Sequence, residues 1–375
     1  LMLYILINDG VTMNAMNDEI IIVFPTKKQM DYLKQQKMEN LSVVLQSDEL
    51  EDVTLLKYVN CIVKDKDGGN LNILRKKRAN VLCCHEEALY WVSINGSKQW
   101  NYQFDRMYFD LLAKDRFKDY LSYNGINNAK YKPEFCDSMK FPVIAKPVIG
   151  FGGIGVKSLE NIKEVKEYLE GYNSMIKNSV VKKYQDMYFP DKDNKCIFEE
   201  KIEGDFYRTP FIVNRRNTKW IFPIKGNEVS PKSISDYHWV GFEYLSYEMN
   251  ITMKVEPLFD ELIKVFQLLP GVYTAEFMVT KEGDVFLLEF SPRQTSSRIS
   301  KIIELAMGID LEIAAIDLFL GRDIEERKIS RQICLKIGND ESLCNKNEWN
   351  HIYSDGKEKN IYGNRIFCHY YEKIE

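Results

Sequence analysis

The sequence predicts an α/β protein, in which a small, mostly parallel sheet precedes two further units of strands and helices. Three observations predict this class. Strand and helix patterns alternate over the first hundred residues, as is typical of parallel sheets. A glycine-rich loop follows a strand near the middle of the chain, and two strands joined by a tight turn follow residue 270. With 375 residues, the chain can bury two or three hydrophobic cores.

The first unit alternates strands with helices. Apolar runs predict strands over Glu19–Phe24, Leu41–Gln46, Val59–Lys64 and Ala79–Cys84, and helices over Lys27–Met38 and Glu86–Ile94. A long helix is then expected over Asp105–Tyr123, because apolar side chains recur there at helical spacing, namely Phe109, Leu111, Leu112, Phe117 and Leu121.

The second and third units follow the break at Gly125. The second unit has an expected strand over Phe141–Lys146, a helix over Asn161–Tyr172, a polar loop over Lys177–Lys195 and a strand over Cys196–Ile202. In the third unit we expect strands over Phe206–Val213, Lys219–Ile224, Val272–Thr280 and Asp284–Phe290, and helices over Val255–Leu269, Ser297–Ala306 and Leu311–Leu320. About 45 further residues carry strand and loop patterns.

Composition excludes several classes of protein. A net charge of −4 with 28% charged residues leaves no dominant basic face, which argues against nucleic-acid binding. Eight cysteines without a C-x-x-C pair and four scattered histidines argue against zinc. We expect reduced cysteines and a cytoplasmic protein. Leu1–Ile7 is too short for a membrane span and lacks the basic leading region of a signal peptide, so we expect no membrane association.

The segment Phe141–Val156, FPVIAKPVIGFGGIGV, places Lys146 on a strand directly before a glycine-rich loop. Glycines let backbone N–H groups approach an anion closely, and an ammonium group beside them is a natural phosphate contact. The loop also matches the dinucleotide fingerprint G-x-G-x-x-G, although that motif normally follows its strand directly. A kinase loop is disfavoured, because no H-R-D or D-F-G segment follows. A hairpin turn without a ligand is the remaining alternative.

The strands AEFMVT and DVFLLEF each carry a glutamate among apolar neighbours, Glu276 and Glu289. A half-buried carboxylate is costly unless a positive charge compensates it. Mg²⁺ supplies such a charge and bridges nucleotide phosphates through one or two protein carboxylates. Arg293 follows four residues after Glu289 and could reach the same phosphates with its planar guanidinium. Alternatively, both glutamates could face solvent on an edge hairpin.

Together, FPVIAKPVIGFGGIGV, IFEEKIEG and AEFMVT…GDVFLLEFSPR resemble the ATP-grasp family, and in particular its carboxylate–amine and carboxylate–thiol ligases. The resemblance covers about residues 81–321 and implies a pre-grasp domain followed by a two-lobed ATP-grasp domain with α+β lobes. The expected division is residues 1–110 for the pre-grasp domain, 111–203 for the small lobe, 204–330 for the large lobe and 331–375 for a C-terminal extension.

The resemblance implies a nucleotide site. In it, Lys146 and the upstream Lys114 bind phosphates, and the loop closes over the β- and γ-phosphates through Gly150, Gly152, Gly153 and Gly155. Glu200, Lys201 and Ile202 resemble the hinge that meets adenine. Asp205 is the nearest acid for the ribose, although the family commonly has a glutamate just after the hinge glycine.

The resemblance also implies a magnesium site (manganese being an alternative) with Glu276, Glu289 and Ser291 as ligands. Ser291 stands where the family usually has asparagine. Serine is a weaker oxygen ligand, so the number of bound metal ions stays open. Arg293 resembles the residue that stabilises the transferring phosphoryl group. Arg298 could bind an amino-acid carboxylate, or it could be a surface arginine behind a serine cap. Arg208, Arg215 and Arg216 are further candidates for anion contacts.

The family's reaction begins when a substrate carboxylate attacks the γ-phosphate of ATP, which gives an acylphosphate and ADP; an amine or thiol then displaces phosphate. The expected partners are small carboxylate and amine substrates, with amino acids or peptides favoured, and a homodimer is compatible with the sequence. Three alternatives stay open: loading of an amino acid onto a carrier-protein thiol, a non-catalytic nucleotide-binding regulatory domain, and an oxidoreductase that uses the G-x-G-x-x-G loop.

Overall fold

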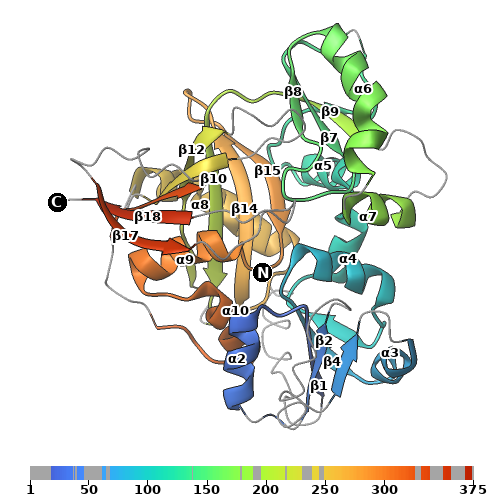
Figure 1. Cartoon of the computed structure of the whole chain (residues 1–375), viewed down its shortest axis with the longest axis vertical. Helices are drawn as coiled ribbons and strands as arrows, with labels where there is room; N and C mark the ends of the chain where they lie inside the picture. The colour runs from blue at the N-terminus through green and yellow to red at the C-terminus, as the bar shows by residue number, and fades with distance from the viewer. Residues whose placement is uncertain are drawn as a thin grey trace, which may run out of the picture.

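The computed structural model of the chain describes residues 18–45 (without 37 and 39), 61–64, 68–177 (without 137), 180–188, 196–215, 218–229, 239–244, 249–325, 331–337, 349–355 and 368–373. The strands among these described residues form three sheets, and the helices cover their faces (Figure 1). Of the sequence-based expectations, Leu1–Ile7, Arg216 and the first two residues of Val59–Lys64 lie outside the described residues.

The sequence predicts a mostly parallel first sheet, and the pairs observed between its described strands are all parallel, in the strand order β3-β2-β1-β4-β5. Its strands are β1 (Glu19–Val23), β2 (Leu41–Leu45), β3 (Cys61–Lys64), β4 (Ala79–Cys83) and β5 (Trp100–Tyr102). The connecting helices are α2 (Lys27–Gln36), α3 (Gly68–Arg75) and α4 (Glu86–Asn95). Strands β1 and β2 are buried along their whole length, as is typical of a sheet that is covered on both faces.

The second sheet is antiparallel, with the order β6-β9-β7-β8. Its strands are β6 (Tyr131–Lys132), β7 (Val143–Pro147), β8 (Lys157–Leu159) and β9 (Cys196–Glu200). Helix α6 (Ile162–Ile176) begins after Asn161, whose side chain accepts a hydrogen bond from the Glu164 N–H at 3.1 Å, and Tyr168 and Tyr172 pack on the sheet. This unit forms the upper right part of the molecule in Figure 1.

The third sheet has the order β15-β14-β10-β12-β13-β16-β18-β17, with β11 paired to β10. Its strands are β10 (Asp205–Val213), β11 (Lys219–Ile221), β12 (Ile224–Val229), β13 (Trp239–Tyr244), β14 (Gly271–Val279), β15 (Val285–Ser291), β16 (Ile333–Ile337), β17 (Trp349–Asp355) and β18 (Cys368–Lys373). Helix α8 (Met249–Val265) packs on one face, whereas α9 (Ser297–Met307) and α10 (Leu311–Phe319) pack on the other. The last three strands therefore extend this sheet.

The expected long helix over Asp105–Tyr123 is wrong. The segment forms a 3-10 helix, η2 (Arg106–Leu111), and then α5 (Lys114–Tyr123). Ala113 between them is extended (φ −81°, ψ 123°), and the Lys114 N–H donates to the Val148 carbonyl oxygen at 2.9 Å. The apolar spacing continued across this break because both helices bury side chains in the same core.

Two further expectations are corrected. The expected loop over Lys177–Lys195 contains a helix, α7 (Val180–Tyr188), whose Val181 and Tyr184 are buried. The expected single strand Lys219–Ile224 is split into β11 and β12. Within the described part of the chain, no helix is both long enough and apolar enough to cross a membrane.

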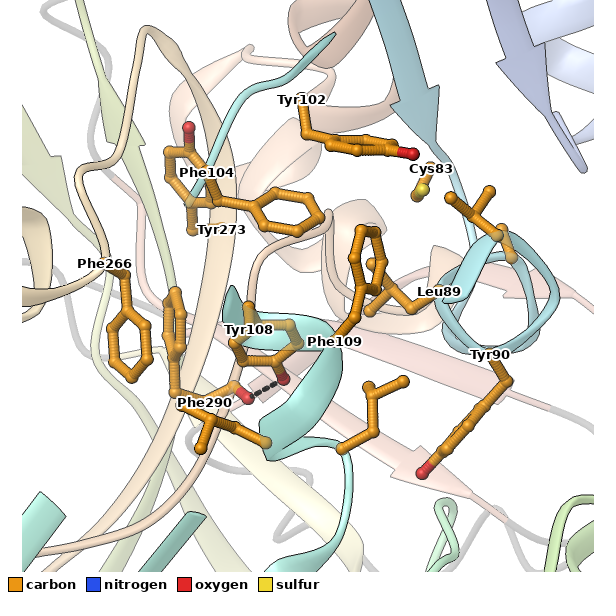
Figure 2. Packing of buried hydrophobic residues seen from close by; sticks show 14 of the residues in the cluster. Cys83, Leu89, Tyr90, Tyr102, Phe104, Tyr108, Phe109, Phe266, Tyr273 and Phe290 are labelled. Atoms are coloured by element: carbon orange, nitrogen blue, oxygen red, sulfur yellow. Dashed lines mark hydrogen bonds between the residues drawn. The ribbon is translucent and has the colours of Figure 1, made fainter. Parts of the chain in front are cut away.

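An aromatic cluster joins η2 to the third sheet (Figure 2). The Tyr108 hydroxyl donates to the Phe290 carbonyl oxygen at 2.6 Å, and the rings of Phe266 and Phe290 stack with their centroids 4.7 Å apart. Because Phe290 directly follows Glu289, this packing fixes the position of one predicted metal ligand relative to the segment that leads into Lys114.

We expect Phe259→Ala in α8 to lower the free energy of unfolding by about 3–5 kcal/mol, because the buried ring contacts Phe211 and Phe277 and its loss leaves a cavity. Urea titration followed by circular dichroism measures this change. Met253→Ala on the same helix is the matched control, since Met253 is 65% exposed and its loss should cost less than about 0.5 kcal/mol. Equal costs for the two variants would contradict this account of the core.

Candidate active site

The glycine-rich loop connects β7 to β8 and is anchored at both ends. Its glycines 152, 153 and 155 have φ values of +65°, +76° and +73°, the region that favours glycine. The Tyr168 hydroxyl donates to the Gly155 carbonyl oxygen at 2.7 Å, and the Lys114 ammonium donates to the carbonyl oxygen of Gly150. Helix α7 lies beside the loop, because the Gln185 side chain donates to the Ile149 carbonyl oxygen at 3.3 Å. The loop is therefore anchored by α5, α6 and α7.

Lys146 lies on β7 and makes an ion pair with Glu199 on β9, with 2.7 Å between Nζ and Oε2. The other carboxylate oxygen lies 3.1 Å from the Nζ of Lys118, which also donates to the Ala129 carbonyl oxygen at 3.3 Å. Glu199 and Lys118 are 2% and 1% exposed. Neither residue is among the site residues that the sequence predicts.

Burial and charge act against each other in this cluster. Burial alone would raise the pKa of Glu199, but the ammonium groups of Lys146 and Lys118 hold that pKa below its ordinary value. Burial lowers the pKa of Lys118 to about 8, although Glu199 opposes the shift, and burial also lowers the pKa of Lys114. The carboxylate is thus charged at neutral pH between two cations.

Arg208, Glu276 and Glu289 form a row across three neighbouring strands. The strand register pairs Arg208 of β10 with Glu276 of β14, and Glu276 with Glu289 of β15. The Arg208 Nε and Nη2 atoms lie 2.7 and 2.6 Å from the same oxygen of Glu276, Oε1. Burial raises the pKa of Glu289 to about 6, with Glu276 adding to the shift and Lys114 opposing it. The two predicted metal ligands therefore lie side by side with incompletely balanced charge.

This row fits a magnesium ion. Mg²⁺ prefers hard oxygen ligands and uses few protein carboxylates when phosphates supply the others. The described residues contain no group of three or more His, Cys, Asp or Glu side chains that could enclose a metal by themselves. Two adjacent carboxylates, one of them with a raised pKa, can instead share an ion with a phosphate chain. Glu276 and Glu289 would hold that ion.

Glu86 is the first residue of α4 and joins the first sheet to the end of β15. Its Oε2 atom accepts hydrogen bonds from the Ser291 hydroxyl at 2.9 Å and from the Arg293 Nε at 2.7 Å. The Arg293 Nη1 also donates to the Gln294 carbonyl oxygen at 2.6 Å. Glu86 thus fixes the position of the predicted catalytic arginine, and the role of Ser291 as a metal ligand stays a prediction.

A pocket brings these elements together. It is lined by residues of α4, η2, α5, the glycine-rich loop and β15, and these include Glu86, Tyr108, Lys114, Lys118, Gly150 and Glu289. Three of the residues predicted from the sequence, Lys114, Gly150 and Glu289, therefore meet at one cavity. Lys146 contacts the same group of charges through Glu199.

The predicted hinge follows β9. The Glu200 carboxylate accepts a hydrogen bond from the Lys130 N–H at 2.9 Å, and the Lys201 Nζ lies 4.0 Å from the Glu203 Oε1. A Cβ on Gly204 would lie 2.3 Å from the Val279 carbonyl oxygen, so only glycine fits this close approach. The roles of Glu200, Lys201 and Ile202 at adenine stay predictions.

Two predicted residues, Asp205 and Arg298, make contacts with other parts of the third sheet. Asp205 begins β10, is half exposed and makes an ion pair with Lys225 at 2.9 Å. Arg298 lies in the first turn of α9, where its carbonyl oxygen accepts a hydrogen bond from the Tyr370 hydroxyl at 3.4 Å. Neither is among the residues that line the pocket. Their roles at ribose and at a substrate carboxylate stay predictions.

We expect Glu199→Gln to lower the free energy of unfolding by about 3–5 kcal/mol, because Lys118 and Lys146 would lose their buried counter-ion. Chemical denaturation at pH 7 measures this loss. Glu203→Gln is the matched control, since its side chain is 83% exposed and should change stability by less than about 0.5 kcal/mol. An unchanged stability of Glu199→Gln would show that the cluster is not a paired charge site.

We expect Glu289→Gln to stabilise the metal-free protein at pH 7.5. The folded pKa of about 6 lies above the ordinary value of 4.5, so the native state binds more protons and is favoured at low pH. That contribution is complete below pH 4.5 and is lost as the pH rises through 6, which costs up to about 2 kcal/mol at neutral pH. Thermal midpoints of both proteins should differ at pH 7.5 and converge near pH 4.5. A difference that is independent of pH would contradict the assignment.

Comparison with known proteins agrees with this geometry. The model of the ATP-grasp domain family matches residues 139–301, which include the glycine-rich loop, the hinge and both glutamates of the row. The N5-carboxyaminoimidazole ribonucleotide synthase of Aquifex aeolicus is 27% identical over 157 residues, which are 42% of this chain. The match spans only 36% of that enzyme.

Solved structures share the fold over nearly the whole chain. The L-amino acid ligase of Bacillus licheniformis superposes with a TM-score of 0.67 and 12% identity, and the match covers 96% of this chain and 94% of that one. The biotin carboxylase domain dimer of Hydrogenobacter thermophilus 2-oxoglutarate carboxylase, a complex with MgADP, ADP and bicarbonate, gives a TM-score of 0.63 at 11% identity, covering 96% of this chain and 86% of that one. Residues 139–301 of this chain therefore match the ATP-grasp domain family, and the chain as a whole shares the fold of these solved structures.

Proposed function

We propose that this protein is an ATP-dependent ligase that activates a carboxylate as an acylphosphate and joins it to an amine. One observation carries the proposal: Lys114, Gly150 and Glu289 line a single pocket, and Glu276 lies beside Glu289 on the neighbouring strand. Cationic groups, loop N–H groups and carboxylates are the set that an enzyme needs to position a polyphosphate and its metal ion.

The charge of each site residue determines the role proposed for it. In this proposal Lys114 and Lys146 neutralise the phosphates, while the glycine-rich loop donates backbone N–H groups to them. Glu276 and Glu289 would hold Mg²⁺, which offsets the charge of the phosphate chain when it is bound. Arg293, held by Glu86 at 2.7 Å, presents its guanidinium to the transferred phosphoryl group.

The reaction has two steps. An oxygen of the substrate carboxylate attacks the γ-phosphorus of ATP, the bond to the β-phosphate oxygen breaks, and ADP leaves. The amine then attacks the carbonyl carbon, the C–O bond to phosphate breaks, and the amine gives up a proton. Closure over the pocket of the whole unit that carries the glycine-rich loop would limit hydrolysis of the acylphosphate.

The substrate class is proposed from likeness alone. The similarity in fold to an L-amino acid ligase supports amino-acid or peptide substrates. The carrier-protein thiol and the regulatory nucleotide-binding domain are the alternatives. We also propose the homodimer and the division into residues 1–110, 111–203, 204–330 and 331–375.

Release of ADP and phosphate from Mg²⁺·ATP, measured across pools of amino acids and other carboxylates, tests the proposal. We expect ADP and phosphate to be released only with a particular pool of carboxylates. The rate should fall at least about 100-fold in Glu289→Gln, as is typical when a group that stabilises the transition state is removed. Arg322→Gln is the control, because Arg322 pairs with Asp317 at 2.9 Å and does not line the pocket.

Other products would contradict the proposal. Formation of AMP and pyrophosphate would exclude an acylphosphate. Tight ATP binding without release in any pool would instead favour the regulatory domain or a protein-borne acceptor.

A further inference from the structure

Arg208 makes a contact that the proposed function does not use. Its Nε and Nη2 atoms lie 2.7 and 2.6 Å from one oxygen of Glu276, Oε1. A guanidinium that paired with a carboxylate in the common fork arrangement would contact both oxygens. Among the residues that the structure describes, none makes a hydrogen bond or ion pair to the other oxygen, Oε2. The carboxylate is thus anchored through one atom and open at the other.

The guanidinium is itself held in place. Its central carbon lies 5.6 Å from the centroid of the Phe242 ring on β13, a cation–π contact, and Phe242 is buried. Arg208 also lies opposite Glu276 in the register of β10 and β14, so backbone hydrogen bonds set the separation of the two residues. The side chains of Arg208 and Glu276 are 28% and 21% exposed, which allows a ligand to reach the pair.

We propose that Arg208 is a positioning residue for the metal carboxylate: it binds Oε1 of Glu276 and presents Oε2 to the divalent cation. Residues that orient metal ligands through hydrogen bonds commonly contribute about 10- to 100-fold to metal affinity. The inference rests on the proposed function and adds a residue that lies on β10, outside the two strands that carry the glutamates.

Geometry separates this role from two others. A residue that competes with the metal would cover both oxygens of Glu276, and its removal would tighten metal binding. A purely structural residue would affect folding and nucleotide binding to the same extent as metal binding. A positioning residue affects the metal alone.

Electron paramagnetic resonance titration of Mn²⁺ against the full chain with bound ADP tests the inference without any substrate. We expect Arg208→Gln to weaken Mn²⁺ about 10- to 100-fold. We also expect Arg208→Lys and Phe242→Leu to give smaller losses, because each keeps part of the arrangement. The affinity for ADP without metal and the thermal midpoint should match those of the unsubstituted protein. Arg322→Gln, another arginine paired with a carboxylate, should bind Mn²⁺ normally.

Several results would overturn the inference. Mn²⁺ affinity that is unchanged or tighter in Arg208→Gln would exclude a positioning role, as would equal losses of Mn²⁺ and of metal-free ADP binding. If Arg208→Gln does not fold, unchanged Mn²⁺ affinity in both Arg208→Lys and Phe242→Leu has the same consequence. Absence of Mn²⁺ binding in the unsubstituted protein would overturn the proposed function as well. If Glu276→Gln abolishes Mn²⁺ binding and Arg208→Gln leaves it intact, only this inference is overturned.

Discussion

Charged groups removed from water must be paired, and in this protein the pairs come from different elements of the fold. Glu199 of the second sheet binds Lys118 of α5 at 3.1 Å, and Glu86 of α4 binds Arg293 beyond β15 at 2.7 Å. An unpaired charge at either place would cost several kcal/mol. The helices and sheets can therefore assemble around the pocket only in an arrangement that brings these partners together, and the same arrangement creates a cluster of cations and carboxylates suited to a phosphate chain.

The first sheet contributes more than its own core to this arrangement. Next to Arg293, the buried Gln294 side chain accepts a hydrogen bond from the Gln29 amide of α2 at 2.7 Å, and Gln29 also donates to the Glu312 carbonyl oxygen of α10 at 3.1 Å. Figure 1 shows α2 beside α10 at the base of the third sheet. Buried polar groups of this kind accept few alternative partners, so they specify how the two units meet. The predicted catalytic arginine thus lies at a junction that both units define.

The elements that were predicted correctly are those that hydrophobic periodicity and glycine positions determine locally. The parallel sheet, the loop after β7 and the hairpin that bears Glu276 and Glu289 follow from local patterns. The site residues that were not predicted are those whose burial and charge partners depend on tertiary contacts. Glu199 and Glu200 are adjacent acids on one strand, and only packing shows that the first is buried between lysines. Glu86 resembles an ordinary acid in the first turn of a helix. Lys118 lies four residues after Lys114, a spacing that places both on one face of α5, and this pattern could have identified it.

The central claim is that a substrate carboxylate receives the γ-phosphoryl group of ATP, and oxygen transfer tests it most directly. A carboxylate that supports turnover is labelled with ¹⁸O in both oxygens and incubated with ATP, Mg²⁺ and the amine, and the released phosphate is analysed by mass spectrometry. The account predicts one ¹⁸O atom in each phosphate, because the attacking carboxylate oxygen leaves with the phosphoryl group. Phosphate without label would contradict it, since the γ-phosphoryl group would then have passed to water.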